Sequence, residues 1–184
     1  MSTPQQVNNI LSPLVVLAQA TTVVLVFSLL APKVKESKKI LMFFKDKTYL
    51  ISFFVALTSM VGSLFYSEVA GYEPCKLCWY QRILMYPLAF LFGFALLKKR
   101  RDLTDYALVL SSLGTFLAGY HYLLQIGVVP TIGCSAIGYS VSCAQRFVMT
   151  YGYITIPMMA FAGFALITVL LFVSKVTSKE KKKS

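Results

Sequence analysis

Five long apolar runs divide this chain, and they limit its fold more than any other feature of the sequence. The runs cover residues 14–30, 49–66, 83–97, 106–126 and 153–173. A helix needs about 20 apolar residues to cross the hydrocarbon core of a bilayer. The hydrophobic fraction of 57% exceeds the roughly 45–50% of soluble domains. The sequence therefore predicts an all-α, multispan membrane protein with five spanning helices.

The first run has a rival interpretation, which is a cleaved signal peptide. The residues before it carry no Lys or Arg, and Pro32 directly follows Ala31, the only small residue at a suitable cleavage position. Signal peptides begin with a positively charged region and end in small residues. We therefore expect residues 14–30 to form a true span.

The basic residues are concentrated in alternate connecting segments. Fifteen of the eighteen Lys and Arg residues fall in residues 31–48, in residues 98–104 and in the tail from residue 174. Five spans place these three segments on one side, which the positive-inside rule makes cytoplasmic. The net charge of +11 is then a topology signal, so we expect membrane lipid and not nucleic acid as a partner.

Four cysteines fall on the opposite, extracytoplasmic side. Cys75 and Cys78 precede the third run, and Cys134 and Cys143 lie between the fourth and fifth runs. Disulfides form and persist in such a compartment. Structural disulfides, a four-thiolate zinc site and a redox relay all remain possible, although the Cys134–Cys143 spacing is wide for half of a zinc site. Within the same loop, residues 141–149 mix apolar and polar positions, which predicts a short interfacial helix.

A relay needs a reactive thiolate, and the first cysteine pair favours one. Cys-x-x-Cys pairs are typical of thiol redox catalysis, and Cys78 falls near the start of a predicted helix, where the dipole stabilises a thiolate. Arg82 adds positive charge one turn further on, although it can equally extend to lipid phosphates. His121, in the fourth run, is either a functional group or a hydrogen-bonding partner between helices. Tyr80 and its aromatic neighbours suit the interfacial aromatic belt.

Motifs in several parts of the chain carry a family resemblance. Residues 74–87 read Pro-Cys-Lys-Leu-Cys-Trp-Tyr-Gln-Arg-Ile-Leu-Met-Tyr-Pro, and Gly-Ser-Leu-Phe-Tyr-Ser-Glu precedes them at 62–68. His-Tyr-Leu-Leu-Gln at 121–125, the Cys134/Cys143 pair and Gly-Tyr-Ile-Thr-Ile-Pro at 152–157 follow. Over about residues 49–175 the chain resembles the DsbB/BdbC family of membrane disulfide-formation proteins, most closely the short-looped BdbC type.

The resemblance implies an architecture and an activity. Residues 49–175 would form a four-helix bundle, preceded by an extra transmembrane helix and basic linker in residues 1–48 and followed by a basic cytoplasmic tail in residues 176–184. The protein would be an enzyme of the cell (inner) membrane that reoxidises a secreted, DsbA-like thioredoxin-fold dithiol oxidase. It would pass the electrons to a membrane quinone, either menaquinone or ubiquinone, and so support disulfide formation in exported proteins.

The resemblance also implies roles for individual residues. The partner's thiol would attack Cys134, and Cys143 would resolve the mixed disulfide and pass electrons to Cys75. Cys78 would face the quinone as a thiolate, close to Arg82. Two further residues are candidates for the cofactor site. These are His121, which resembles a histidine near the quinone in that family, and Tyr80.

Two alternatives remain open on the sequence. The first is an enzyme similar to vitamin K epoxide reductase, in which the Cys-x-x-Cys lies in the last helix of the bundle and not ahead of the third of five runs. The second is a non-enzymatic membrane protein with structural disulfides or a metal site of four cysteines. Stoichiometric zinc with four protected thiols would identify this second class.

Overall fold

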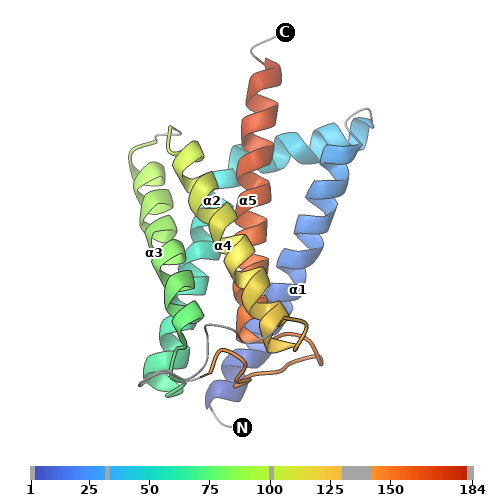
Figure 1. Cartoon of the computed structure of the whole chain (residues 1–184). Coiled ribbons are helices and arrows are strands. Elements are labelled where there is room, and N and C mark those ends of the chain that lie inside the picture. Colours follow the sequence, from blue (N-terminus) through green and yellow to red (C-terminus); the bar gives the residue numbers. More distant parts are fainter. Residues whose placement is uncertain (1–2, 32–33, 100–101, 130–141, 182–184) are drawn as a thin grey trace.

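The computed structural model describes residues 3–31, 34–99, 102–129 and 142–181 of the chain. Five α-helices account for most of these residues (Figure 1). They are α1 (Thr3–Leu30), α2 (Lys35–Leu64), α3 (Lys76–Leu97), α4 (Thr104–Gln125) and α5 (Ile156–Lys181), and a π-helical turn, η1 (Phe65–Val69), follows α2. In the described part of the chain, five helices are long and apolar enough to cross a membrane. The prediction of an all-α multispan membrane protein is confirmed.

Consecutive helices run in opposite directions, which sorts the connections between the two ends of the bundle (Figure 1). The connection between α2 and α3 and the described parts of the segment between α4 and α5 lie at the bottom of the view, with the start of α1. The start of α2, the described residues after α3 and the C-terminal end of α5 lie at the top. Cys75, Cys78 and Cys143 therefore lie at the end opposite the described basic residues.

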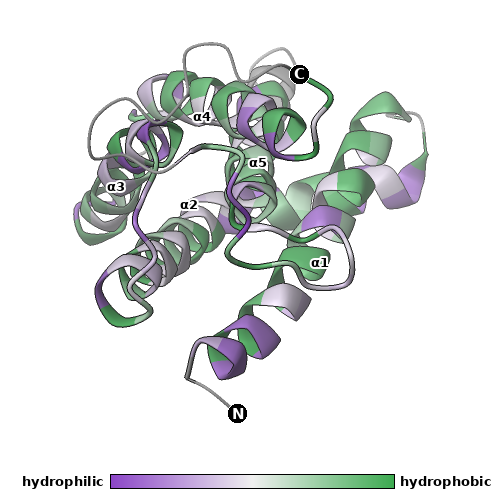
Figure 2. Cartoon of the chain, turned by 60° about the horizontal axis from the view of Figure 1, so that its bottom comes forward, coloured by the Kyte–Doolittle hydropathy of each residue, from purple (hydrophilic) through white to green (hydrophobic). Residues whose placement is uncertain are grey.

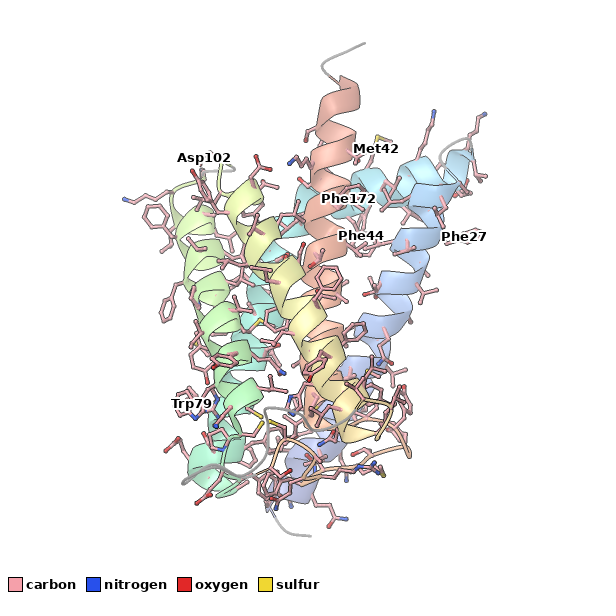
Figure 3. The ribbon with its side chains drawn as sticks, viewed as in Figure 1. Phe27, Met42, Phe44, Trp79, Asp102 and Phe172 are labelled. Carbon is pink, nitrogen blue, oxygen red and sulfur yellow. The ribbon has the colours of Figure 1, made fainter. Side chains whose placement is uncertain are left out.

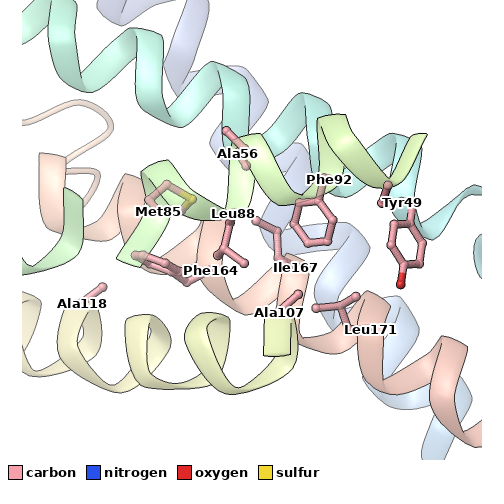
Figure 4. Packing of buried hydrophobic residues seen from close by; sticks show 12 residues of the cluster. Tyr49, Ala56, Met85, Leu88, Phe92, Ala107, Ala118, Phe164, Ile167 and Leu171 are labelled. Atoms are coloured by element: carbon pink, nitrogen blue, oxygen red, sulfur yellow. The ribbon is translucent and has the colours of Figure 1, made fainter. Parts of the chain in front are cut away.

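Helices α2 to α5 enclose one hydrophobic core (Figure 4). Phe92 of α3 and Phe164, Ile167 and Leu171 of α5 are buried at its centre. Small residues let the helices approach closely, as is usual where packing and not hydrophobic transfer holds membrane helices together. A Cβ added to Gly114 of α4 would lie 2.2 Å from the Phe164 ring, so α4 can pack this closely against α5 only with glycine at that position.

Helix α1 lies outside this four-helix core, beside α5 (Figure 2). Leu25 of α1 is fully buried in a second cluster with Leu166, Leu170 and Val173 of α5. Side chains from the first half of α2, including Phe44, pack against the same cluster (Figure 3). The bundle thus has four central helices and one peripheral helix.

Two local predictions differ from the structure. Helix α2 already begins at Lys35, inside the segment expected to be a basic linker. Lysine and glutamate are good helix formers, and Glu36 pairs with Lys39 at 2.9 Å. The short interfacial helix predicted for residues 141–149 is wrong for residues 142–149, which form turns and irregular backbone. The Gln145 carbonyl there accepts a hydrogen bond from the Gln125 side chain at 2.8 Å, so it is engaged by α4 instead of by a helix of its own.

Candidate functional site

The first cysteine pair forms the start of α3. Cys75 is the N-cap residue, with extended backbone angles, and its sulfur accepts a hydrogen bond from the Cys78 backbone N–H at 3.4 Å. Cys78 lies in the first turn, and the two Sγ atoms are 3.0 Å apart. Both cysteines are free thiols. The cap position points the Cys75 sulfur at the unpaired N–H groups of the helix start, where negative charge is favoured.

His121 of α4 lies beside this pair and is 2% exposed. Its Nδ1 is 2.9 Å from the Gln81 side-chain nitrogen. Because an amide nitrogen only donates, Nδ1 accepts and the hydrogen of the neutral ring is carried by Nε2. Nε2 lies 3.6 Å from Cys75 Sγ and 3.2 Å from the Cys143 carbonyl oxygen. Gln81 therefore fixes the tautomer in which His121 donates toward Cys75.

These donors stabilise the thiolate of Cys75. The hydrogen bond from the Cys78 thiol is the largest cause of a strongly lowered Cys75 pKa, and the hydrogen bond from His121 lowers it further. Burial acts in the opposite direction but is outweighed. The sequence placed the thiolate on Cys78, whereas the geometry of the reduced pair favours Cys75, because Cys75 is the residue that caps the helix.

Cys143 of the second pair is buried against the first. It is 1% exposed, disulfide-bonded, and packed in a cluster with Cys75, Leu77 and Leu124. Cys134 lies outside the described residues. The ligand atoms of Cys75, His121 and Cys143 all fall within 4.8 Å of one another. A disulfide sulfur is not the thiolate ligand that zinc requires, so in this state the cluster is better arranged for thiol–disulfide exchange than for a metal.

The segment after Cys143 is fastened to the end of α4. Arg146 donates from Nε and Nη2 to the Gln125 carbonyl oxygen, at 3.1 and 2.7 Å. A helix C-terminus leaves such carbonyls without intrahelical partners and carries partial negative charge, which suits an arginine. Tyr72, ahead of the first cysteine pair, stacks on Phe147 with ring centroids 4.8 Å apart. These contacts hold the two cysteine segments together.

Arg82 is buried and held by α2. It is 9% exposed, donates from Nε to Ser63 Oγ at 2.9 Å and from Nη2 to the Ser63 carbonyl oxygen at 3.0 Å, and its guanidinium lies 5.1 Å from the Trp79 ring centroid. The chain as far as it is described gives Arg82 no carboxylate partner. A buried guanidinium fixed in this way is suited to an anionic or partly negative oxygen, and it does not extend to lipid phosphates.

A cavity of about 400 Å³ begins at Cys78 and Arg82 and is walled by side chains of α1, α2, α3 and α5. Its lining is mostly apolar, and its volume is in the range of small-molecule sites, about 300–1,000 Å³. A smaller cavity of about 60 Å³ lies over Cys75, His121 and Cys143, and Cys78 and Arg82 also border it. Cys78 thus contacts both cavities, whereas Cys75 contacts only the smaller one.

The structure brings together most, but not all, of the predicted site residues. Cys75, Cys78, Cys143, Arg82 and His121 meet at one end of the bundle. His121 lies with the thiols and does not line the larger cavity. Tyr80 is 55% exposed and lines neither cavity, so it stays a prediction without structural support.

Ser63 and Gln81 position Arg82 and His121. Sequence analysis included both residues within the family motifs but gave neither a role at the site. The signal available in the sequence was a polar side chain within an apolar helix.

The comparisons with known proteins show what most of the chain is similar to. The family model described as "Disulfide bond formation protein DsbB" matches residues 45–174. A "Probable disulfide formation protein" of Oceanobacillus iheyensis is 45% identical over 116 residues, which is 62% of this chain and 79% of that protein. The "Disulfide bond formation protein C" of Bacillus subtilis is 37% identical over 129 residues, covering 67% and 89% of the two chains. No solved structure matches the chain significantly. Helix α1 precedes the matched region.

Proposed function

Because this chain belongs to the DsbB family of disulfide bond formation proteins, we propose a specific electron path for its thiol oxidoreductase activity. Electrons pass from a secreted thioredoxin-fold dithiol through the second cysteine pair to the first pair, and then to a membrane quinone. The observation that carries this proposal is the position of Cys78, which borders both cavities, while Cys75 borders only the cavity that holds Cys143.

The exchange steps begin at the second pair. The partner's thiolate attacks Cys134, the Cys134–Cys143 bond breaks, and Cys143 leaves as a thiolate. Cys143 then attacks Cys75 of an oxidised first pair and displaces Cys78. Once the partner's second thiol closes its own disulfide, the freed Cys134 attacks Cys143 and releases Cys75. Each step forms one S–S bond and breaks one, and the cycle leaves two electrons and two protons on the first pair.

The contact between Cys143 and Cys75 supports this order. Their sulfurs belong to one buried cluster within 4.8 Å, so Cys143 can reach Cys75 without a large movement of the backbone. Cys75 is also the better leaving group in the last exchange, since thiols with a low pKa leave faster and its pKa is lowered by its hydrogen-bond donors. His121 therefore serves the exchange reaction, as the donor that stabilises the Cys75 thiolate.

The larger cavity suits a quinone. A quinone bound there would supply the electron acceptor, and the first pair would give up its two electrons and two protons. Arg82 is placed to donate to a ring oxygen, since Ser63 already fixes its guanidinium in the cavity wall. The walls of this cavity beside Cys78 are mostly apolar. Cys75 and Cys78 end the step joined by a disulfide and ready for the next exchange.

We infer that the cysteine end of the bundle faces outside the cytoplasm. The described basic residues at the start of α2, directly after α3 and in the last part of α5 lie at the other end (Figure 1). Positive charge next to spans is retained in the cytoplasm. This orientation exposes the second cysteine pair to a secreted partner and keeps the first pair within reach of the bilayer.

The test is a two-substrate assay on the purified protein. Reduced thioredoxin-fold dithiol is mixed with the protein and a quinone, and loss of quinone absorbance is followed together with oxidation of the donor. The wild type should turn over both substrates in equal amounts. Cys78→Ser should stop quinone reduction while the protein still inserts and purifies normally. Undiminished quinone reduction by Cys78→Ser would refute the path.

A further inference from the structure

Helix α1 lies outside the region shared with the family, yet it forms part of the larger cavity. The family model begins at residue 45, whereas Leu11, Leu14, Leu17, Ala18 and Thr21 of α1 line the cavity together with α2, α3 and α5. Spaced by three or four residues, these positions form one face of a helix. The cavity that starts at Cys78 and Arg82 is therefore closed on one side by an element the family does not require.

Specific contacts hold α1 in this position. Tyr66 donates to Asn8 Oδ1 at 2.5 Å, and Tyr153 donates to Gln19 Oε1 at 3.0 Å. Leu11 packs against α2 at Gly62, where an added Cβ would lie 3.5 Å from Leu11 Cδ1, in ordinary van der Waals contact. In lipid, close packing and interhelical hydrogen bonds are what hold helices together. Helix α1 is thus seated against the bundle at several points and is not merely an anchor.

The cavity is longer than the head group of an acceptor needs. Its lining residues on α2 extend from Phe44 to Ser63, which at 1.5 Å per residue places them roughly 30 Å apart along the helix. A ring held at Arg82 occupies only the end near the cysteines. The α1 wall offers apolar groups, and the Thr21 hydroxyl is already bonded to the Leu17 carbonyl at 2.8 Å. This part of the cavity is suited to a hydrocarbon chain and not to a polar head group.

We propose that α1 is the lateral wall of a channel for the isoprenoid tail of the quinone, and that it makes the enzyme selective for long-tailed acceptors. This inference rests on the proposed quinone activity and deepens it. The ring lies at Cys78 and Arg82, and the tail runs between α1 and the groove of α2 and α5. The opening toward lipid is lined by Leu14 and Leu17, which are 48% and 63% exposed.

Two matched substitutions on α1 test the proposal. Ala18 lines the cavity, whereas Ala20 is exposed and does not line it. Ala18→Phe and Ala20→Phe add the same volume to the same helix on different faces. In purified full-length protein, kcat/KM is measured with a quinone that carries a long isoprenoid tail and with a tail-less quinone of the same ring. Overfilling a packed site costs on the order of 1–3 kcal/mol, so Ala18→Phe should lower kcat/KM for the long-tailed quinone by about tenfold.

Three outcomes distinguish a failure of this inference from a failure of the proposed function on which it rests. Loss for the long-tailed quinone alone, confined to Ala18→Phe, supports the channel. Unchanged selectivity, or an equal loss with both quinones, overturns the channel but does not contradict the proposed quinone reductase function. A wild-type protein that reduces neither quinone would instead refute the proposed function itself.

A second measurement does not depend on the folding of a variant. A long-tailed quinone with a photoreactive group at the end of its tail is irradiated with the wild-type protein, and the labelled peptides are identified by mass spectrometry. Label should appear on α1 within residues 11–21 and should be displaced by unlabelled long-tailed quinone but not by the tail-less one. Labelling that is confined to α3, or that excess long-tailed quinone does not displace, would refute the channel.

Discussion

His121 makes a sharp prediction about the reactivity of Cys75. Its Nε2–H is a buried donor 3.6 Å from the Cys75 sulfur, and this hydrogen bond is among the causes that lower the Cys75 pKa. A hydrogen bond to a charged group contributes about 1.5–3 kcal/mol. At about 1.4 kcal/mol per pKa unit, His121→Ala should raise the Cys75 pKa by roughly 1–2 units; the weak geometry of a 3.6 Å contact to sulfur favours the lower figure.

The sign of the pH dependence follows from the direction of the shift. A lowered pKa keeps Cys75 a reactive thiolate at acidic pH, and reactivity is lost only as the pH falls through that pKa. In His121→Ala this loss should occur at higher pH. The largest cause, the Cys78 thiol, is unchanged, so the variant should still ionise below the ordinary cysteine value of about 8.5.

The assay is alkylation of the reduced protein with iodoacetamide across a pH series. Trypsin cleaves after Lys76, which places Cys75 and Cys78 in separate peptides that mass spectrometry can quantify independently. His121→Gln, whose amide can reach the Nε2 position, should recover part of the shift. Ser111→Ala, buried on the same helix but distant from the cysteines, is the control. An alkylation midpoint for Cys75 that is the same in wild type and His121→Ala would refute the assignment.

Three further predictions concern the cavity, the second cysteine pair and the core. Arg82→Gln removes the buried charge beside the cavity and should lower kcat/KM for the quinone by about tenfold or more, since hydrogen bonds to charged groups contribute about 1.5–3 kcal/mol. Cys143→Ala leaves Cys134 as a free thiol, which can attack the disulfide of an oxidised partner and release one partner thiol; because no Cys143 thiol is present to displace the partner, a mixed disulfide should accumulate and be visible on a non-reducing gel. Gly114→Ala places a methyl group 2.2 Å from the Phe164 ring and should lower the free energy of unfolding by about 1–3 kcal/mol, measured by thermal unfolding in detergent.

Each of these has an outcome that contradicts it. Unchanged quinone kinetics in Arg82→Gln would mean that its bonds to α2 are structural only. Absence of an adduct with Cys143→Ala, when Cys134→Ala and Cys143→Ala are compared side by side, would contradict the proposed order of exchange. Wild-type thermal stability of Gly114→Ala would show that α4 and α5 can separate there without cost.

The spans were predictable because hydrophobicity along the chain is a local property. The five apolar runs are confirmed as five helices that are long and apolar enough to cross a membrane, and the described basic residues of the expected cytoplasmic segments lie at one end of the bundle. The start of α2 was not predictable in the same way. Residues 35–48 carry lysines that lie at exposed positions, and a hydropathy argument does not distinguish a polar linker from a helix whose polar face is exposed.

The site was predictable to the extent that it is local. Cys78 and Arg82 are four residues apart and share one face of α3, which the cavity confirms. The same periodicity indicates that Tyr80, two residues from Cys78, faces away. The bond from Arg82 to Ser63 and the placement of His121 beside Cys75 depend on how separate helices rotate and pack. Spacing within one sequence does not contain that information.

The position of Cys78 on the border of two cavities separates the places where the two substrates react. In the proposed path the soluble donor reacts at the second cysteine pair and the lipid-soluble oxidant reacts in the larger cavity, so neither has to leave a shared pocket for the other. High concentrations of donor should therefore not compete with the oxidant, and high oxidant should not inhibit the donor. The first turn of α3 would then join two reaction sites whose substrates come from different phases, one from water and one from lipid.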